Sequence, residues 1–462
     1  MNERILPNTE VDTGPPVFPA DRFPEQARDA RLLGIYPQRQ PGRYMQRVRV
    51  PGGLLRAAQW RALARIAREL TPQTPLHLTT RQDIELHDLA AQDVPRAQQA
   101  LAEAGLTTLG SGGDTLRNIT VCPCAAGGTA DAPDLLPLAH AIGRALAEYE
   151  PLFCLPRKFK LSLSGCREAC GRPYVHDLAF VAVREGDRWR LKAIGAGSLG
   201  PKPVLGIVLA ERIEPGEAPA LALAAVRLFA RHGDRQNRSQ ARLRHVRQRM
   251  GDAAFLEALV DEFEAARRQR RWPEIALVAP VSPSQSRRVL ACANGDLSPE
   301  AAEALAELAG AGHSVRIGQD HCVYLFGAEE RLQAGIELHA ALAGLAPGRH
   351  KVITCPGTRW CARALTDTNA LADRVRDALP APAEGELMIA ISGCPNGCAH
   401  SAVADIGLVG GRSVVEGRPT EVYHVLAGGG RGSDATLART VAKALPTEEA
   451  LARVIELARG GV

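Results

Sequence analysis

Ser392-Gly393-Cys394-Pro395-Asn396-Gly397-Cys398 is one of two cysteine turns that decide the fold; the other is Thr354-Cys355-Pro356-Gly357-Thr358-Arg359-Trp360-Cys361. Together they hold a C-x3-C pair and a C-x5-C pair. Four thiolates are the ligands of a cubane iron–sulfur cluster, and soft thiolates select iron–sulfur or zinc. Zinc sites favour shorter C-x2–4-C pairs, and unrelated buried thiols would not lie in two such Gly- and Pro-rich turns. The turns therefore predict a [4Fe-4S] cluster bound by Cys355, Cys361, Cys394 and Cys398.

Composition limits the class of protein. A chain of 462 residues suggests two to four domains, and eleven irregularly spaced cysteines argue for metal chemistry in a reducing compartment rather than a disulfide framework. The chain has no apolar run of membrane-spanning length, and residues 1–24 lack an apolar signal region. We therefore expect a cytoplasmic protein with no membrane partner. The net charge of +5 suits an acidic protein donor or a small anion and is too small to argue for nucleic acid.

The two halves of the sequence repeat each other. A strand–helix–strand–helix pattern over residues 44–104 returns over residues 289–342. Residues 119–123 then parallel residues 352–356, and residues 159–166 lead into a cysteine turn as residues 390–394 do. We interpret this as an internal duplication in which one copy keeps the cluster ligands.

The other copy offers cations near its turns. Arg81 ends a strand-like run, Arg117-Asn118 precedes the first Cys-Pro turn, and Lys158 and Lys160 lie two apart, on one face of a strand. Taken singly, each cation is an ordinary surface charge. This copy also has its own cysteines, Cys122, Cys124, Cys166 and Cys170, for which a second cluster is an alternative. Cys154, Cys292 and Cys322 are interpreted as small buried hydrophobic residues.

T-C-P-G-x3-C followed by S-G-C-P-N-x-C resembles the sirohaem and [4Fe-4S] site of assimilatory sulfite and nitrite reductases. The resemblance implies that all four cysteines bind the cluster and that Cys398 also ligates the sirohaem iron. It assigns substrate binding and proton donation to Arg81, Arg117, Lys158 and Lys160. It also implies that cofactor carboxylates face a polar set: Arg47, Arg49, Arg81, Arg117, Asn118 and Asn396. Finally, it argues against a cluster in the first copy.

These patterns together predict an α+β protein with a pseudo-twofold duplicated architecture. We expect an extended arm (1–44), ferredoxin-like half-domains (45–115 and 273–348) and two mixed α/β cofactor-binding domains (116–272 and 349–462). The first α/β domain includes a helical connector whose basic stretches, 235–249 and 267–271, we interpret as solvated helix faces, with docking of an acidic donor as the alternative.

The expected activity is six-electron reduction of sulfite to sulfide, with electrons passing through the cluster to sirohaem. Sulfite-reducing members of the family typically carry R-K-x-K where this chain has Arg157 to Lys160, whereas plant-type nitrite reductases have asparagine in place of the second lysine. The alternatives are a nitrite reductase that forms ammonia and, third, a cluster-only relative such as a corrin-biosynthesis enzyme. A cluster-bearing nucleic-acid binder has only the basic helices in its favour.

One further motif bears on the electron donor. Gly195-Ala196-Gly197-Ser198-Leu199-Gly200 matches G-x-G-x-x-G, but Pro201 and Pro203 would break the helix that a dinucleotide site requires. We favour a glycine loop whose amides touch cofactor carboxylates. A separate donor, ferredoxin or a flavoprotein, is therefore expected.

Overall fold

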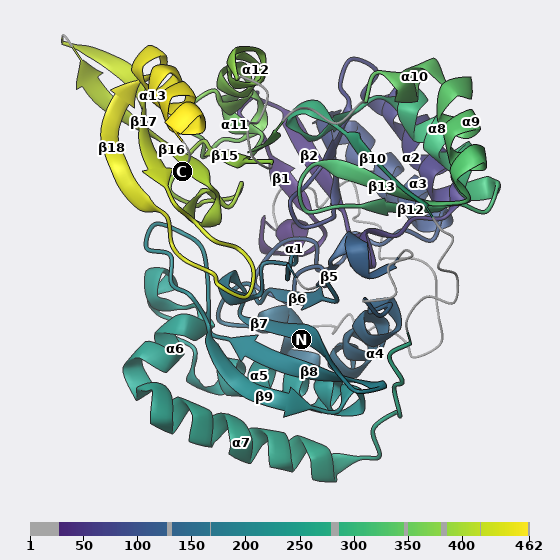
Figure 1. The fold of residues 1–462 in the computed structure, drawn as a ribbon, viewed down its shortest axis with the longest axis vertical. Helices are drawn as coiled ribbons and strands as arrows, with labels where there is room; N and C mark the ends of the chain where they lie inside the picture. The colour runs from purple at the N-terminus through teal and green to yellow at the C-terminus, as the bar shows by residue number, and fades with distance from the viewer. Residues whose placement is uncertain are drawn as a thin grey trace.

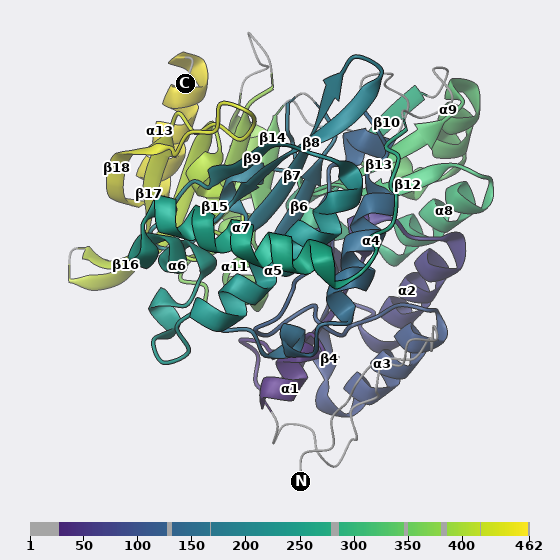
Figure 2. The ribbon, with the colours of Figure 1, turned by 90° about the horizontal axis from the view of Figure 1, so that it is seen from below.

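The described chain forms four β-sheets, two in each half (Figures 1 and 2). The structure is a computed structural model, and it describes residues 27–126, 132–166, 168–278, 286–345, 350–379, 386–415 and 417–460. In Figure 1 the two smaller sheets and their helices lie at the upper right, the first α/β unit below them, and the second α/β unit at the upper left.

The first small sheet has the strand order β1-β2-β4-β3-β11. Its elements are α1 (Ala27–Leu32), β1 (Ile35–Pro37), β2 (Arg43–Val48), α2 (Ala57–Leu70), β3 (Leu76–Leu78), β4 (Ile84–Ala90) and α3 (Val94–Glu103). The helix α2 buries a stripe that includes Trp60, Leu63 and Ile66, because these apolar positions recur at helical spacing.

The second small sheet repeats this unit with the order β10-β13-β12. Its elements are β10 (Ser286–Ala291), α8 (Pro299–Gly310), β12 (Ser314–Ile317), β13 (Cys322–Gly327), α9 (Glu329–Leu338) and α10 (Ala340–Ala343). The short strand β11 (Asp296–Leu297) follows β10 in the chain but pairs with β3 of the first small sheet. Ser298 caps α8 by accepting a hydrogen bond from the backbone N–H of Ala301. The two units share one hydrophobic core, in which Leu63 of α2 and Leu305 of α8 are both buried.

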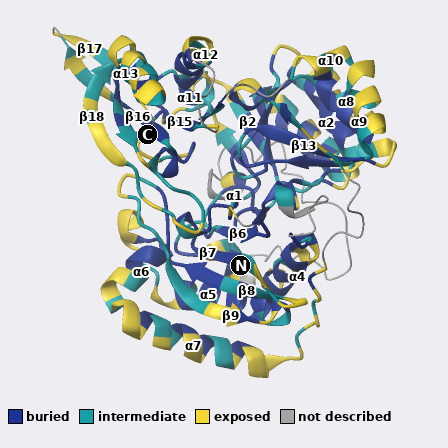
Figure 3. Ribbon diagram, viewed as in Figure 1, coloured by how far each residue is buried: buried dark blue, intermediate teal, exposed yellow. Residues whose placement is uncertain are grey.

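The first α/β unit has the strand order β5-β6-β7-β8-β9. Its elements are β5 (Thr120–Val121), α4 (Leu136–Ala147), β6 (Leu161–Ser164), β7 (Leu178–Glu185), β8 (Arg188–Gly195), β9 (Ile207–Ile213), α5 (Ala218–His232), α6 (Leu243–Met250) and α7 (Asp252–Gln269). Figure 3 shows the inner strands and α5 as buried and the outer side of α7 as exposed. The amphipathic α7 covers α5 with Phe255 and Leu259.

The second α/β unit has the order β14-β15-β16-β17-β18. Its elements are β14 (Lys351–Thr354), α11 (Gly357–Trp360), α12 (Thr368–Ala378), β15 (Met388–Ser392), β16 (Ile406–Val415), β17 (Arg418–Ala427), β18 (Arg439–Pro446) and α13 (Thr447–Gly460). In both α/β units the first two strand pairings are parallel and the last two antiparallel. All residues of β15 are buried, as its continuous apolar sequence predicts for a parallel strand inside a sheet.

The duplication extends to single side chains. Gln82, with φ of 60°, donates from Nε2 to the carbonyls of Val121 and Ile317 at 2.8 and 2.7 Å. Its counterpart His321, with φ of 59°, lies 2.7 and 2.8 Å from the carbonyls of Leu78 and Thr354. Each residue therefore ties its own half to the other, and the expected α+β duplicated architecture is confirmed.

The structure bears on three expectations: the extended arm, the glycine motif and the absence of a membrane-spanning helix. Residues 27–44 of the expected extended arm are not extended throughout, because α1 and β1 add to the first sheet; residues 1–26 lie outside the described residues. The glycine motif at 195–200 ends β8, and a loop leads from it to β9 without a helix, so it is no dinucleotide site. Within the described ranges, no helix is both long and apolar enough to cross a membrane.

Candidate active site

The two cysteine turns meet at one edge of the second α/β sheet. Cys355 follows β14 and Cys394 follows β15, and because these neighbouring strands are parallel, their carboxyl ends lie side by side. The backbone N–H of Gly393 donates a hydrogen bond of 3.2 Å to the Cys355 sulfur. Gly397, with φ of 66°, allows the tight turn between Cys394 and Cys398.

The four thiols are close enough to influence one another electrostatically. Burial, with a further contribution from Cys398, raises the pKa of Cys355 to about 12. Burial also raises the pKa of Cys361 and of Cys394, and Cys398 contributes to both rises. No three of these four sulfurs lie within 4.8 Å of one another. Converging thiols whose deprotonation needs a positive charge fit an inorganic iron–sulfur core.

Cations from the first half gather opposite these turns. Arg81 follows β3, Arg117 precedes β5, and Lys158 and Lys160 flank Phe159, which pairs with Leu116. Phe159 is fully buried, so the two lysines point away from the core on the other face of this extended segment. The four predicted cations therefore come from two neighbouring sheets: Arg81 follows β3 of the first small sheet, and the other three lie just before β5 and β6 of the first α/β sheet.

Arg81 is held by the parts of the first half that surround it. One guanidinium nitrogen lies 3.1 Å from Nε2 of His176, and another donates to the carbonyl of Asn118. Asn118 in turn donates to the carbonyls of Val50 and Arg81, at 2.7 and 3.0 Å. Asn118 thus positions Arg81, and its own amide group is buried.

Positive charge exceeds negative charge in this region. Arg47 is paired with Glu85 at 2.7 Å and Arg242 with Asp177 at 2.8 Å. Within the described residues no carboxylate forms an ion pair with the others, which are Arg49, Arg81, Arg117, Lys158 and Lys160. The Nε atoms of Arg81 and Arg117 are buried without a hydrogen-bond acceptor. Unmatched, converging donors fit a ligand with several carboxylates, as sirohaem has.

The crowding of charge lowers the pKa of these cations. Burial lowers the pKa of Arg81 to about 9, and burial together with Arg242 lowers that of Lys158 to about 7. The pKa of Lys160 falls well below its ordinary value through burial, Arg81 and Lys158. A lysine with the pKa of Lys158 can release a proton near neutral pH.

The cysteine turn and the cations belong to one site. Thr80, next to Arg81, donates a hydrogen bond of 3.0 Å to the carbonyl of Cys398. The Cys398 thiol is close enough to Lys158 and Lys160 to oppose in part the lowering of their pKa values. Asn396 is exposed and bonds toward the Cys394 thiol, and no hydrogen bond or ion pair joins its described side chain to the cations.

Sequence reasoning missed a second layer around the pocket. Arg242 and Arg244 are buried, so the interpretation of residues 235–249 as a solvated face is wrong at the start of α6. Arg242 pairs with Asp177, which also accepts from the backbone N–H of Lys160 at 2.8 Å. The one signal in the sequence is the R-x-R-H run at the start of α6. Its charged residues lie on more than one face of the helix, so they cannot all face solvent.

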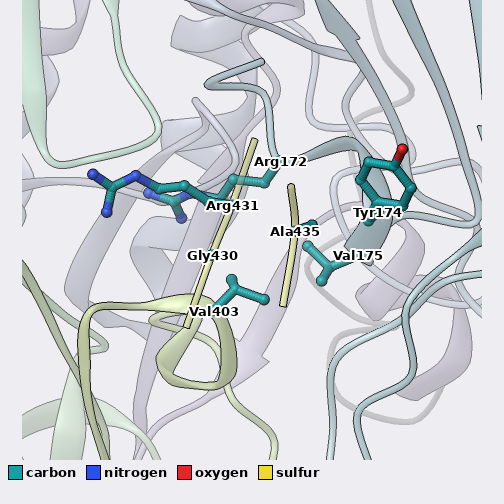
Figure 4. Close-up of a pocket in the computed structure, with 7 residues that line it drawn as sticks. All are labelled: Arg172, Tyr174, Val175, Val403, Gly430, Arg431 and Ala435. Carbon is teal, nitrogen blue, oxygen red and sulfur yellow. The ribbon is translucent and has the colours of Figure 1, made fainter. Parts of the chain in front are cut away.

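In the second half, the place that corresponds to the cations of the first half is occupied by the side chain of Arg172. Asp320 stands there where the first half has Arg81, and Met388 where it has Lys160. The Arg172 guanidinium lies 3.5 Å from the Met388 sulfur and 3.2 Å from the carbonyl of Gln319, and it also contacts His400. Figure 4 shows Arg172 and Arg431 side by side at a small crevice beside Tyr174 and Val403. The duplication therefore leaves one cation pocket and one cluster turn, each from a different half.

Comparisons with known proteins agree with this geometry. The family described as "Nitrite and sulphite reductase 4Fe-4S domain" matches residues 112–266 and 346–459, and the "Nitrite/Sulfite reductase ferredoxin-like half domain" matches residues 36–104. The "Assimilatory ferredoxin-dependent nitrite reductase" of Haloferax mediterranei is 29% identical over 94% of this chain and 84% of its own length.

A sulfite reductase and a solved structure are also similar to this chain. The "Sulfite reductase [NADPH] hemoprotein beta-component" of Acidithiobacillus ferrooxidans is 31% identical over 79% of this chain and 74% of its own length. The solved structure of the NirA protein of Mycobacterium tuberculosis shares the fold, with a TM-score of 0.80 and 24% identity over 93% of this chain and 86% of that one. This chain belongs to the nitrite and sulfite reductase family, whose members are oxidoreductases that carry a [4Fe-4S] cluster and sirohaem.

Proposed function

We propose that this chain is a ferredoxin-dependent nitrite reductase that converts nitrite to ammonia. The observation that carries the reductase assignment is the contact between Thr80 and Cys398, because it brings the cluster turn of one half against the cations of the other. The choice of substrate rests on the relatives: those from Haloferax mediterranei, Synechococcus elongatus and Leptolyngbya laminosa, at 28–29% identity, are all named nitrite reductases. This favours the alternative over the sulfite reduction that we expected from Lys160.

The chain's own residues divide the work. Cys355, Cys361, Cys394 and Cys398 would hold the cluster, with Cys398 also reaching the sirohaem. When bound, these two cofactors supply the six-electron redox chemistry. Arg47 and Arg49 on the β2 side, with Arg117 and Asn118, would contact cofactor carboxylates, since arginine suits bidentate carboxylate contacts. Asn396 would contact the cofactor carboxylates only if its exposed side chain turned toward them.

The substrate is an anion that loses oxygen as water, so its site must supply both charge and protons. Arg81, with Nε unpaired, is placed to hold the anion. Lys158, whose pKa is about 7, is placed to donate a proton at neutral pH. Lys160 lies between the charges of Arg81 and Lys158 and would relay or supply a second proton.

Sulfite reduction is the second candidate, and Lys160 is the observation that favours it. A more highly charged anion gains more from an extra cation than nitrite does. Burial, Arg81 and Lys158 lower the pKa of Lys160 well below its ordinary value, however, which weakens this argument. The cation set also argues against a cluster-only relative, because such a protein would have no use for five unpaired cations around one pocket.

A separate electron donor follows from the same proposal. The relatives from Synechococcus elongatus and Arabidopsis thaliana are named for ferredoxin, whereas that from Acidithiobacillus ferrooxidans is named for NADPH. Ferredoxin fits this chain better, because its net charge of +5 would attract an acidic protein. None of the eleven cysteines is in a disulfide, which suits the reducing cytoplasm.

The test begins with protein purified anaerobically. Its visible spectrum should show the Soret and red bands of sirohaem, and kcat/KM with reduced methyl viologen should be higher for nitrite than for sulfite. A higher value for sulfite would overturn the nitrite assignment, and a spectrum without a Soret band would support the cluster-only relative. Cys398→Ser should lose both cofactors, whereas the control Cys154→Ser, at an exposed cysteine away from the site, should keep them.

A further inference from the structure

The first copy of the α/β unit brings its own four cysteines together. Cys122 follows β5, Cys124 lies in the turn of Pro123–Ala126, and Cys166 and Cys170 follow β6. The sulfurs of Cys122, Cys166 and Cys170 all lie within 4.8 Å of one another. The Cys166 and Cys170 sulfurs are 3.2 Å apart, and those of Cys170 and Cys124 are 4.0 Å apart. No residue assigned above to the cofactors or the substrate belongs to this set.

Backbone N–H groups donate hydrogen bonds to these sulfurs, as one does to Cys355 in the second copy. The N–H of Gly165 donates to the Cys122 sulfur at 3.1 Å, as Gly393 does to Cys355 at 3.2 Å. The N–H of Cys170 donates to the Cys166 sulfur at 3.2 Å, and Arg287 of β10 lies 3.5 Å from the Cys124 sulfur. Such donors stabilise thiolates, which are the metal-binding form of cysteine.

We propose that Cys122, Cys124, Cys166 and Cys170 bind a single tetrahedral Zn²⁺ ion. Four sulfurs at Zn–S bonds of about 2.3 Å lie about 3.8 Å from one another in a tetrahedron. The separations of 3.2 and 4.0 Å bracket that value. Cys124 lies outside the group of three sulfurs within 4.8 Å of one another, so the ion would draw it inward. The set is more compact than the thiols of the second copy, of which no three lie within 4.8 Å. A cubane core occupies the space between its thiolates and needs the wider arrangement.

The sulfur separations, rather than the C-x-C spacing, which is shorter than the C-x2–4-C pairs usual for zinc, support one ion over a disulfide. The first pair is C-x-C here, not the C-x5-C of the second copy, which draws the sulfurs inward. A disulfide between Cys166 and Cys170 would use only two of the four cysteines. It would not explain why the sulfurs of Cys122 and Cys124 lie beside that pair. One ion uses all four.

The ion would brace the substrate side of the molecule. The turn after β6 leads to Arg172, whose carbonyl bonds Nδ1 of His176 at 2.9 Å, and Nε2 of His176 contacts Arg81. Arg287 adds a contact from the second small sheet. The metal would therefore fix the loop that orients Arg81 without touching the substrate.

The experiment is metal analysis of the full chain purified anaerobically. We expect about one zinc per chain, and zinc-edge X-ray absorption should show four sulfur neighbours at about 2.3 Å. Cys124→Ser and Cys170→Ser should each lower zinc at least fivefold while the iron, sulfide and reduced-cluster EPR signal of the second copy stay unchanged. Cys154→Ser is the matched control and should retain zinc.

Three results would overturn the proposal. The first is wild-type protein without zinc whose four thiols are all alkylated in the native state. The second is a Cys166–Cys170 disulfide found by mass spectrometry of that protein. The third is iron and sulfide sufficient for a second cubane. The X-ray absorption measurement uses the wild-type chain, so it decides the question even if a cysteine variant fails to fold.

Discussion

The hydroxyl of Thr80 donates a hydrogen bond of 3.0 Å to the carbonyl of Cys398, a residue 318 positions further along the chain. Thr80 precedes Arg81 and Cys398 ends the second cysteine turn, so one bond fixes the distance between a substrate-side cation and a cluster-side sulfur. Each half of the duplicated chain supplies one partner. Under the proposed function, the reactive centre would therefore form between the two halves.

Thr80→Val removes this bond and keeps the shape of the side chain. We expect unfolding free energy to fall by about 1 kcal/mol, the usual contribution of one hydrogen bond. Because catalytic geometry is sensitive to small displacements, we expect kcat with reduced methyl viologen to fall about tenfold. Thr80→Ser keeps the hydroxyl and should stay close to wild type. Equal kcat values for Thr80→Val and wild type would show that the Cys398 turn is held by other contacts.

Arg81→Gln should raise KM for nitrite and lower kcat/KM by about 10- to 100-fold, since a charge-assisted hydrogen bond contributes about 1.5–3 kcal/mol. Arg81→Lys should recover only part of this loss, because an ammonium cannot reach both the Asn118 carbonyl and His176. Steady-state kinetics at saturating donor measures the effect. The sirohaem bands serve as a check that the cofactor is still bound, and an unchanged KM would remove Arg81 from the anion site.

The lowered pKa of Lys158 predicts how kcat/KM depends on pH. Its pKa, lowered to about 7, means that the ammonium is present below that pH and the neutral amine above it. Both anion binding and proton donation need the ammonium, so kcat/KM should fall about tenfold per pH unit above pH 7. In Lys158→Met the activity should be low and this alkaline limb absent. A wild-type profile that is flat from about pH 6 to pH 9 would contradict the role.

Lys160→Asn tests substrate preference. Removal of the second lysine takes away a charge that helps sulfite more than nitrite. We expect kcat/KM for sulfite to fall about tenfold more than that for nitrite, measured on one preparation with both anions. Lys443→Asn is a matched control, because Lys443 is exposed on β18, the last strand of the second α/β sheet. An equal fall for both anions would mean that Lys160 acts only in proton supply.

The cysteine turns were predictable because their chemistry is local. A C-x3-C turn with Gly397 at positive φ follows from neighbouring residues alone, and two parallel strands necessarily place their turns at one edge. The duplication was visible for the same reason, since strand and helix periods repeat along the chain. Arg242 was misjudged because its charge suggested solvent, while its partner Asp177 lies 65 residues earlier and is buried.

The sequence by itself determined the two α/β units, the two small sheets and the residues at their turns, because each depends on spacing within a short stretch. It did not determine which thiols or cations would face each other. Tertiary packing decided that Thr80 meets Cys398, that Arg172 fills the second-half pocket, and that Cys122 and Cys124 join Cys166 and Cys170. The physical reason is that burial and charge at these positions come from residues far away in the chain, which only the folded arrangement brings within hydrogen-bond distance.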